Sequence, residues 1–542
     1  MLILDVKGGY FTLQFKYDPE IVAKMKYIFG AKWDSKLRLW KFPLQRDTYE
    51  TLKEMFPEMI ETDAVEKARE QFKLLDEIQM YKQAKKLEQP KGIKTKLWLH
   101  QLRGYHFFKY LDYGGIFMEM GTGKTLLALS IMADKPVRRI LVVCPKAVKQ
   151  VWRKEILKHI EHPYFVVVLE GSTEKKLATV KKYWSINHDK IVFVNNYESM
   201  WRRPLGDFFL SNPPDMIIAD ESHKIKAHNS KQSKYLYQLG KSVKYKYLLT
   251  GTPSPQGPLD YYGQFRFLNS NIFGASWSKF KNHFAIEQQI PNGIKIVTGY
   301  KNLDELNRKV YQISYRVRTT DVLDLPKLIE SVMPVELDNK TKKIYQQMSE
   351  GFFAILEDET VAVNHKLTQL LKLQQITNGF ILDENHKAKQ ISKEKLDALM
   401  EILDDVGEKE KVVVFTNFKH DVEIIKKELE KKKITYAEIT GSKNTMTDFT
   451  EGDARVCIVN IRSGGAGIDL TVSRYAVYYG LNYSLELFEQ SKARVYRHGQ
   501  NKTTYIYYLL GKDTIDEKIY KALNKKMSLN EMLETMRKEA QL

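Results

Sequence analysis

Residues 114–132 read GGIFMEMGTGKTLLALSIM, and this stretch decides the fold of the first half of the chain. It begins with the apolar composition of a buried strand, and the apolar residues after Thr125 continue as a helix. A glycine-rich turn between a strand and a helix lets backbone N–H groups approach phosphate oxygens, and the helix N-terminus adds partial positive charge. We therefore predict a nucleotide-binding loop made of Gly121, Thr122, Gly123, Lys124 and Thr125.

Two side chains of this loop carry specific chemistry. The Lys124 ammonium is expected to reach the β- and γ-phosphates of the nucleotide, and the Thr125 hydroxyl is expected to ligate Mg²⁺. ATP and Mg²⁺ are therefore the predicted nucleotide and metal.

Strand-like and helical segments alternate outward from this loop. Short runs rich in β-branched residues include RILVVCP, KIVFVNN, DMIIAD and KYLLTGTP, and the pattern restarts at 411 with KVVVFTN, ARVCIVN and YAVYYG. Fully apolar short strands separated by helices are typical of parallel sheets covered on both faces. The sequence therefore predicts an α/β fold with two parallel-sheet lobes, a helical insertion between them and a small N-terminal α+β domain. The expected boundaries are 1–45 for the α+β domain, 46–94 for a helical connector, 95–260 for an ATP-binding first lobe, 261–400 for the insertion, 401–515 for the second lobe and 516–542 for a C-terminal helix.

Composition narrows the class of protein. The 542 residues exceed what one core usually holds, and a hydrophobic content of 43% excludes a disordered chain. With only two cysteines, Cys144 and Cys457, a disulfide scaffold and a cysteine-based zinc site are excluded. No apolar run approaches the roughly 18 residues that span a bilayer, and Asp5 and Lys7 interrupt any leader peptide. We expect a soluble cytoplasmic protein with no membrane partner, and the Lys-, Ile- and Asn-rich composition suggests a bacterium or its phage.

The positive charge is concentrated in one part of the chain. The net charge is +19, and residues 91–260 carry 28 Lys and Arg against 14 Asp and Glu. Residues 1–45 are also basic, with 8 against 4, whereas residues 46–90 are acidic, with 8 against 11. This distribution favours a polyanionic partner for the first lobe. We prefer nucleic acid as that partner to the alternative that the positive charge only keeps the surface solvated.

Two carboxylates end the strand-like segment DMIIA. In a parallel α/β sheet, side chains at the carboxyl ends of the strands face the phosphate loop. We expect Asp220 to hold Mg²⁺ through water and Glu221 to orient and deprotonate the attacking water. The alternative is a surface acidic pair that caps the next helix. His223 either couples this site to the adjoining lobe or is a packed histidine, and hydroxyls in LTGTP, residues 249–253, are placed to sense the γ-phosphate.

A pair of arginines lies far downstream, in the segment QSKARVYRHGQ. On a helix, Arg494 and Arg497 are three residues apart and would project from one face. Two arginines poised across a lobe interface suit the charge that spreads over the γ-phosphoryl group during its transfer. We therefore predict a catalytic role for both.

The motifs GTGKT, DESH, LTGTP, VVVFTN, GGAGIDL and QSKARVYRHGQ, in this order, resemble the helicase motifs of superfamily two in its Swi/Snf-like branch. The resemblance covers about residues 95–520. It implies two RecA-like lobes and a double-stranded DNA-dependent ATPase that translocates along DNA without unwinding it processively. The segment LHQLRGY resembles the adenine-reading segment of that family, which implies that Gln101 hydrogen-bonds the base.

The same resemblance implies DNA contacts in both lobes. The segments from Cys144 to Trp152 and from Asn195 to Glu198 match first-lobe segments that touch the phosphate backbone. The DNA-binding residues implied are Lys146, Lys149 and Asn196 in the first lobe and Ser463 and Gly464 in the second. The two lysines could equally be solvated helix residues. Such contacts are sequence-independent and salt-sensitive.

The N-terminal segment FKYDPEIVAKMKYIFGAKWDSKLRLWKFPL resembles the HARP-type module of annealing helicases that remodel stalled replication forks. The resemblance implies recognition of branched DNA or of junctions between single and double strands. Trp33 and Trp40 are expected to stack on exposed bases. The alternative, most of all for Trp40, is that the two rings form the core of a small domain.

These expectations predict an ATP-driven double-stranded DNA translocase that remodels branched DNA by fork regression, branch migration or strand annealing, and that acts as a monomer. An alternative in the same class is a DNA-tracking ATPase that displaces bound proteins. An alternative from another class is a non-catalytic DNA-binding scaffold, against which the intact Lys124, Asp220, Glu221 and Arg497 argue.

Overall fold

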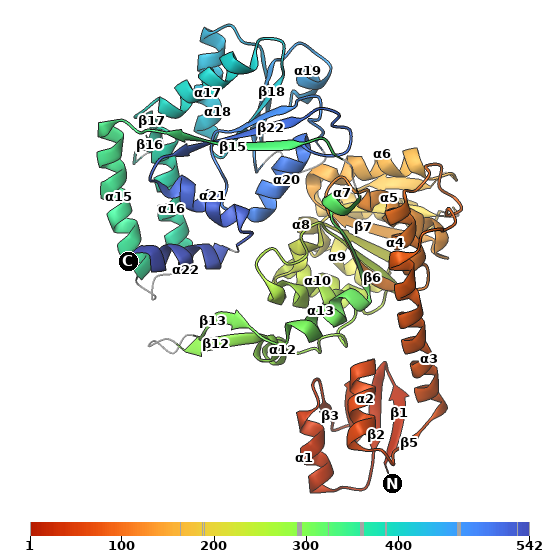
Figure 1. The fold of residues 1–542 in the computed structure, drawn as a ribbon. Coiled ribbons are helices and arrows are strands. Elements are labelled where there is room, and N and C mark those ends of the chain that lie inside the picture. Colours follow the sequence, from red (N-terminus) through yellow and green to blue (C-terminus); the bar gives the residue numbers. More distant parts are fainter. Residues whose placement is uncertain are drawn as a thin grey trace. The chain divides into compact units, whose positions relative to one another are not determined.

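The protein is described by a computed structural model that covers residues 2–540 except 163, 187, 189, 290–294, 323–324, 358–362, 385–386, 463–467 and 528. The chain divides into two compact units, Met1–Val322 and Leu323–Leu542, and each is described by itself. The α/β class predicted from the sequence is confirmed, because each unit is built on a fully parallel sheet (Figure 1). In the described part of the chain, no helix is both long and apolar enough to cross a bilayer.

Unit 1 begins with a small α+β module. Its five-stranded sheet has the order β3-β4-β2-β1-β5, and α1 starts where Asp18 accepts hydrogen bonds from the backbone N–H groups of Glu20 and Ile21. The elements are β1 (Ile3–Lys7), β2 (Tyr10–Gln14), α1 (Pro19–Tyr27), β3 (Lys32–Asp34), β4 (Leu39–Pro43), α2 (Arg46–Met55), β5 (Ile60–Glu61) and α3 (Asp63–Glu77).

The module is larger than the predicted 1–45. Leu52, Val65 and Phe72, from the expected connector, are buried in the same core as Phe11 and Phe42. The outer faces of α2 and α3 carry acidic, helix-forming residues. Their charge predicted a solvated connector and concealed the apolar face that each helix buries in this core. The segment 46–94 therefore contributes α2, β5 and α3 to the module, and continues through the short helix η1 (Ile78–Gln83).

The first lobe contains a seven-stranded parallel sheet of order β14-β6-β11-β10-β7-β9-β8. Its strands are β6 (Tyr113–Met118), β7 (Arg139–Cys144), β8 (Phe165–Val168), β9 (Ile191–Asn196), β10 (Met216–Asp220), β11 (Tyr245–Leu249) and β14 (Ser314–Val317). The helices are α4 (Leu99–Lys109), α5 (Lys124–Asp134), η2 (Lys146–Val148), α6 (Lys149–His159), α7 (Thr173–Trp184), α8 (Tyr197–Met200), α9 (Leu205–Ser211), η3 (Ser222–Ile225) and α10 (Lys231–Gly240). Two apolar cores cover the two faces of this sheet, as the unbroken apolar strands predicted.

The predicted insertion, residues 261–400, is divided between the units. Its first part stays in unit 1 and returns as β14, which pairs with β6. Its elements there are η4 (Pro258–Asp260), α11 (Tyr261–Leu268), α12 (Trp277–Phe284), the hairpin strands β12 (Ala285–Gln289) and β13 (Lys295–Tyr300), α13 (Leu303–Gln312) and α14 (Thr319–Val322). The segment is therefore neither a separate body nor wholly helical.

Unit 2 holds a six-stranded parallel sheet of order β15-β22-β21-β18-β20-β19. Its strands are β15 (Leu328–Val335), β18 (Val412–Thr416), β19 (Tyr436–Ile439), β20 (Val456–Asn460), β21 (Tyr475–Tyr478) and β22 (Thr504–Gly511). The other elements are α15 (Asn339–Glu357), α16 (Val363–Thr377), the strand pair β16 (Phe380–Leu382) and β17 (Ala388–Gln390), α17 (Glu394–Val406), α18 (Lys419–Lys431), α19 (Met446–Thr450), α20 (Leu485–Val495), α21 (Ile515–Asn524) and α22 (Leu529–Ala540). The strand β15, from the predicted insertion, extends this sheet beside β22.

Candidate nucleotide and DNA sites

The glycine-rich loop joins β6 to α5, as the sequence predicted. Gly121 and Gly123 adopt φ values of 79° and 83°, a region that favours glycine. A side chain at Gly123 would overlap the amide nitrogen of Gln101. Lys124 and Thr125 form the first turn of α5, and both side chains are half-buried.

Gln101 lies directly against this loop. Its Oε1 accepts a hydrogen bond of 2.9 Å from the Trp98 backbone, and its Nε2 donates one of 3.1 Å to the Thr122 carbonyl. His100 Nε2 donates to the same carbonyl at 2.8 Å. Gln101 is 3% exposed, so in this structure it holds the loop and only its second amide hydrogen is free for a base.

Asp220 ends β10, in the middle of the first sheet. Its Oδ2 accepts a 2.8 Å hydrogen bond from Trp152 Nε1, and its Oδ1 accepts one of 3.0 Å from the Glu221 backbone. Burial, followed by the neighbouring charge of Glu221, raises the pKa of Asp220 to about 6, and the Lys124 ammonium acts in the opposite direction. The electrostatic effect of Lys124 on Asp220 means that the structure brings the predicted lysine and carboxylate together.

Glu221 has an unusual backbone. Its φ of 51° and ψ of 54° lie in the left-handed region, where a residue with a side chain is strained. Its Oε2 is 3.5 Å from His223 Nδ1 and accepts no hydrogen bond from another described residue. His223 Nδ1 is also 3.3 Å from Thr250 Oγ1, so the turns after β10 and β11 meet at this histidine.

A buried carboxylate and a hydroxyl at the start of a helix are donors of the kind that suits Mg²⁺. Asp220 supplies the carboxylate and Thr125 the hydroxyl, and burial raises the pKa of Asp220 to about 6. Among the described residues, no cluster of three or more His, Cys, Asp or Glu side chains forms a separate metal site. The residues therefore fit a magnesium ion held jointly with nucleotide phosphates.

The predicted DNA contacts of the first lobe differ in accessibility. Lys146 is exposed on η2. Lys149 is 2% exposed, and its Nζ is 2.7 Å from both the Leu169 carbonyl and a Glu170 carboxylate oxygen. This placement argues against a phosphate contact of Lys149 in this conformation, because its charge is already paired below the surface.

Asn196 is also largely buried, with 7% of its surface exposed. Its Oδ1 accepts hydrogen bonds from Lys176 Nζ at 2.7 Å and Ser199 Oγ at 2.9 Å, and its Nδ2 donates to Glu198 at 2.6 Å. All three polar partners lie within the same unit, so in this structure the asparagine organises the turn after β9. A phosphate contact of Asn196 stays a prediction and would require these bonds to rearrange.

In unit 2, the two predicted arginines do not share a helix face. The helix α20 ends at Val495, and Tyr496 has left the helical conformation with φ −106° and ψ 88°. Gln500 lies against this helix end, because its Nε2 donates to the Ser473 carbonyl at 2.8 Å and to the Val495 carbonyl at 3.4 Å. Arg494 is buried and Arg497 is half-buried beyond the helix. Ser463 and Gly464 lie outside the described residues.

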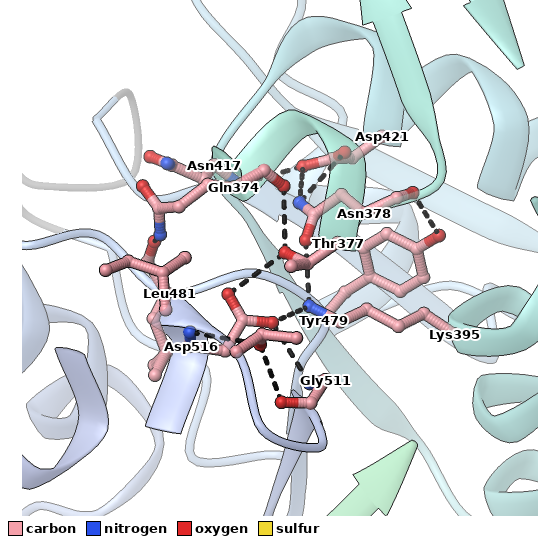
Figure 2. Close-up of polar contacts among 12 residues, drawn as sticks. Gln374, Thr377, Asn378, Lys395, Asn417, Asp421, Tyr479, Leu481, Gly511 and Asp516 are labelled. Atoms are coloured by element: carbon pink, nitrogen blue, oxygen red, sulfur yellow. Dashed lines mark hydrogen bonds and ion pairs between the residues drawn. The ribbon is translucent and has the colours of Figure 1, made fainter. Parts of the chain in front are cut away.

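A buried polar network lies at the carboxyl end of the second sheet (Figure 2). Asn378 Nδ2 donates to both oxygens of Asp421, at 3.2 and 3.1 Å, and its Oδ1 accepts from Lys395 Nζ at 2.9 Å. Lys395 Nζ also lies 2.5 Å from Asp516. No local sequence pattern indicates this network, because its members come from five separate segments.

The aromatic residues of the N-terminal module have different environments. Trp40 is 8% exposed and belongs to the module core, which excludes base stacking by this ring as the module is folded here. Trp33 is 48% exposed, and its ring centroid lies 5.8 Å from that of Trp40. Tyr17 and Tyr27 are more exposed still, at 79% and 85%, although the sequence did not single them out.

The module docks on the first lobe through polar contacts. Gln45 Nε2 donates to the carbonyls of Asn271 and Ile272, at 2.6 and 2.8 Å, and its Oε1 accepts from Lys309 Nζ at 2.9 Å. Arg308 pairs with Asp47 at 3.0 Å. The joint is therefore specific, although no local sequence pattern marks it.

Comparison with known proteins places most of the chain in two families. Residues 82–381 match the SNF2-related domain, and residues 394–499 match the helicase conserved C-terminal domain. The match to the SNF2-related domain covers more than half of the chain and includes the glycine-rich loop and the Asp220-Glu221 pair.

Individual relatives are distant. A putative protein of Acyrthosiphon pisum secondary endosymbiont phage 1 is 26% identical over 76% of this chain and 92% of its own length. A DNA repair and recombination protein RAD54-like of Drosophila ananassae is 26% identical over 80% of this chain but only 62% of its own length. The solved SWI2/SNF2 ATPase core of Sulfolobus solfataricus, in complex with double-stranded DNA, is 25% identical with a TM-score of 0.41, over 81% of this chain and 93% of that one.

Proposed function

Because the chain belongs to the SNF2-related family of DNA-dependent ATPases, we propose that it is an ATP-driven double-stranded DNA translocase that remodels branched DNA. The observation that carries the motor assignment is the meeting of Lys124, Asp220 and Glu221 at the carboxyl end of one parallel sheet. The finer assignment, branched DNA as substrate, is supported by the N-terminal module.

Each residue of the nucleotide site has a proposed role. Lys124 binds the β- and γ-phosphates, and Thr125 and Asp220 hold a magnesium ion that neutralises phosphate charge. Glu221 accepts a proton from the attacking water, which suits a carboxylate oxygen that no described residue occupies with a hydrogen bond. Arg494 and Arg497 of unit 2 stabilise the charge of the transferring phosphoryl group.

The module presents aromatic rings and positive charge together. Tyr17, Tyr27 and Trp33 are exposed, and the exposed basic residues of the same segment are Lys16, Lys24, Lys26, Lys32, Lys36 and Arg38. Rings that stack on unpaired bases, among lysines that contact phosphates, suit the point where duplex and single strands meet.

The docking of the module fixes this surface on the first lobe. The Phe29 ring packs against the His283 ring in a tilted arrangement, with centroids 4.3 Å apart, and Lys279 Nζ donates to the Ala31 carbonyl at 3.3 Å. Tyr27 and Trp33 flank this contact in the chain. A junction held by these rings would therefore stay in register with the lobe that binds ATP.

The test uses the full chain with Tyr27→Ala and Trp33→Ala combined. Loss of two stacking rings should lower affinity for a forked DNA by about tenfold or more at one fixed salt concentration. Duplex-stimulated ATP turnover should be unchanged, because neither ring touches the nucleotide site.

The matched control is Tyr110→Ala, which removes a ring that is 48% exposed at the end of α4 and outside the module. This variant should keep the preference for forks. If the module variant regresses forks as well as the unaltered chain, the module is not the junction reader and the motor assignment stands alone.

A further inference from the structure

One buried glutamine touches both turns that carry the strand-end motifs of the nucleotide site. Gln264 lies on α11 and has no exposed surface. Its Oε1 accepts a 2.7 Å hydrogen bond from Ser222 Oγ, in the turn after β10. Its Nε2 donates to the Pro253 carbonyl at 2.6 Å, in the turn after β11, and to the Asp260 carbonyl at 3.0 Å.

The helix α11 packs directly on the backbone of the first turn. A side chain at Gly263 would overlap the carbonyl oxygens of Ile225 and Lys226, so glycine is needed for this approach. Asp260, just before α11, lies 3.7 Å from Lys226 and accepts a 2.7 Å hydrogen bond from the Gln256 backbone. The start of α11 is therefore bonded to both turns, and Gln264 is the buried centre of that connection.

The first turn needs such support because of Glu221. A left-handed backbone is unfavourable for a residue with a side chain, and such a conformation persists only where its neighbours enforce it. Ser222 follows Glu221 directly and is fully buried. Its bond to Gln264 fixes the turn immediately after the strained residue, while the bond from the Tyr197 hydroxyl to the Asp220 carbonyl, 2.7 Å, fixes it immediately before.

We propose that Gln264 is a positioning residue for ATP hydrolysis, which acts through Ser222 to place the Glu221 carboxylate and through Pro253 to tie that placement to the turn that carries Thr250 and Thr252. Gln264 touches neither nucleotide nor water in this role. The inference rests on the proposed function of Glu221 as the base. It predicts that the two turns respond to the γ-phosphate as one body.

The experiment measures duplex-stimulated ATP turnover by the full chain for Gln264→Met, Ser222→Ala and the double variant. Each single variant removes the same buried hydrogen bond and should lower kcat by about tenfold, with KM for ATP changed by less than about twofold. The double variant should be no slower than the slower single variant, because the second change removes nothing further.

Tyr235→Phe is the matched control, since it removes a buried 2.8 Å hydrogen bond to the Gly206 carbonyl in the same lobe, away from the site. It should lower the melting temperature about as much as Ser222→Ala, which also removes one side-chain hydrogen bond, and leave kcat unchanged. Three outcomes would overturn the proposal. In the first, the losses of kcat in the two single variants multiply in the double variant. In the second, a raised KM for ATP accounts for the lower turnover, and in the third, Tyr235→Phe loses as much kcat as the other variants. Turnover that survives Lys124→Ala would instead refute the nucleotide site itself.

Discussion

The carboxyl ends of the two parallel sheets hold similar residues in opposite states. In unit 1, Lys124 makes no hydrogen bond through its ammonium to another described residue, and Glu221 Oε2 accepts none. In unit 2, Asp421 accepts hydrogen bonds from Asn378 and from the backbones of Asn417 and Phe418, and Lys395 is paired with Asp516. The charged groups at the first end have unused hydrogen-bonding capacity, and we call it the open end. The charged groups at the second end, Lys395, Asp421 and Asp516, are paired within the protein, and we call it the closed end (Figure 2).

The difference shows that topology alone does not make a site. Ligands of open parallel sheets bind at the carboxyl ends of the strands, and both sheets provide such an end. What distinguishes them is whether charged groups are satisfied within the protein, because only unsatisfied groups gain from a ligand. Lys124 is therefore proposed to bind a ligand in unit 1, whereas Lys395 is paired with a buried carboxylate in unit 2.

The largest effect is expected for Lys124→Ala. Loss of the phosphate-binding ammonium should abolish ATP turnover, while DNA affinity and melting temperature stay near those of the unaltered chain. Steady-state ATPase and duplex-binding titrations measure the two outcomes. Lys154→Ala, an exposed lysine on α6, is the control and should be silent. Near-normal turnover in Lys124→Ala would show that the carboxyl end of the first sheet does not bind ATP through this lysine.

Arg497→Ala tests whether unit 2 contributes an open group of its own. Arg497 Nε is buried and has no hydrogen-bond partner among the described residues. Turnover should fall by about a thousandfold, as for arginine fingers, with little change in ATP affinity. Arg474→Ala, which breaks a 2.7 Å pair with Glu410 in the same unit, should leave turnover unchanged. A fall in melting temperature with a matching loss of activity would make Arg497 structural.

Lys395→Met tests the closed end. The change leaves the buried Asp516 without its cation, and removing one partner of a buried pair costs about 3–5 kcal/mol of unfolding free energy. The melting temperature of unit 2 should drop clearly, with KM for ATP unchanged in the protein that stays folded. Lys431→Met, at an exposed pair with Glu428, should cost nothing measurable. A stable Lys395→Met variant with altered KM would show that the network is a ligand site after all.

The smallest effect concerns pH. The pKa of Asp220 is raised from 3.8 to about 6, so the folded protein holds this proton more tightly than the unfolded chain between these values. Its contribution to stability is therefore complete below pH 3.8 and is lost as the pH rises through about 6. Between about pH 5 and about pH 7, the melting temperature of Asp220→Asn should therefore fall less than that of the unaltered chain. Parallel slopes for the two proteins would show that Asp220 is not under electrostatic strain.

The sequence predicted what depends on local pattern. The strand–loop–helix around Lys124 and the carboxylates after β10 follow from apolar runs and turn residues, and the structure has both in the expected places. The sheets were predictable for the same reason, because strands buried on both faces are apolar throughout. These features need no knowledge of distant partners.

Side-chain direction was not predictable, because it depends on such partners. Lys149 is turned inward by Glu170, and Asn196 by Lys176, which lie on other segments. Arg497 was placed on a helix that ends two residues earlier, at Val495, where Gln500 from farther along the chain bonds the last carbonyl. Trp40 belongs to a core completed by residues beyond 45, which the sequence alone assigned to a connector.

The left-handed backbone of Glu221 also bears on how this sequence would evolve. Glycine at position 221 would remove both the strain and the carboxylate, so it should raise heat resistance and end hydrolysis. Populations selected in the laboratory for survival at high temperature alone are therefore expected to acquire glycine there repeatedly. Populations that must also hydrolyse ATP should keep glutamate. The residue at position 221 would therefore show whether selection has acted on ATP hydrolysis or only on the stability of the fold.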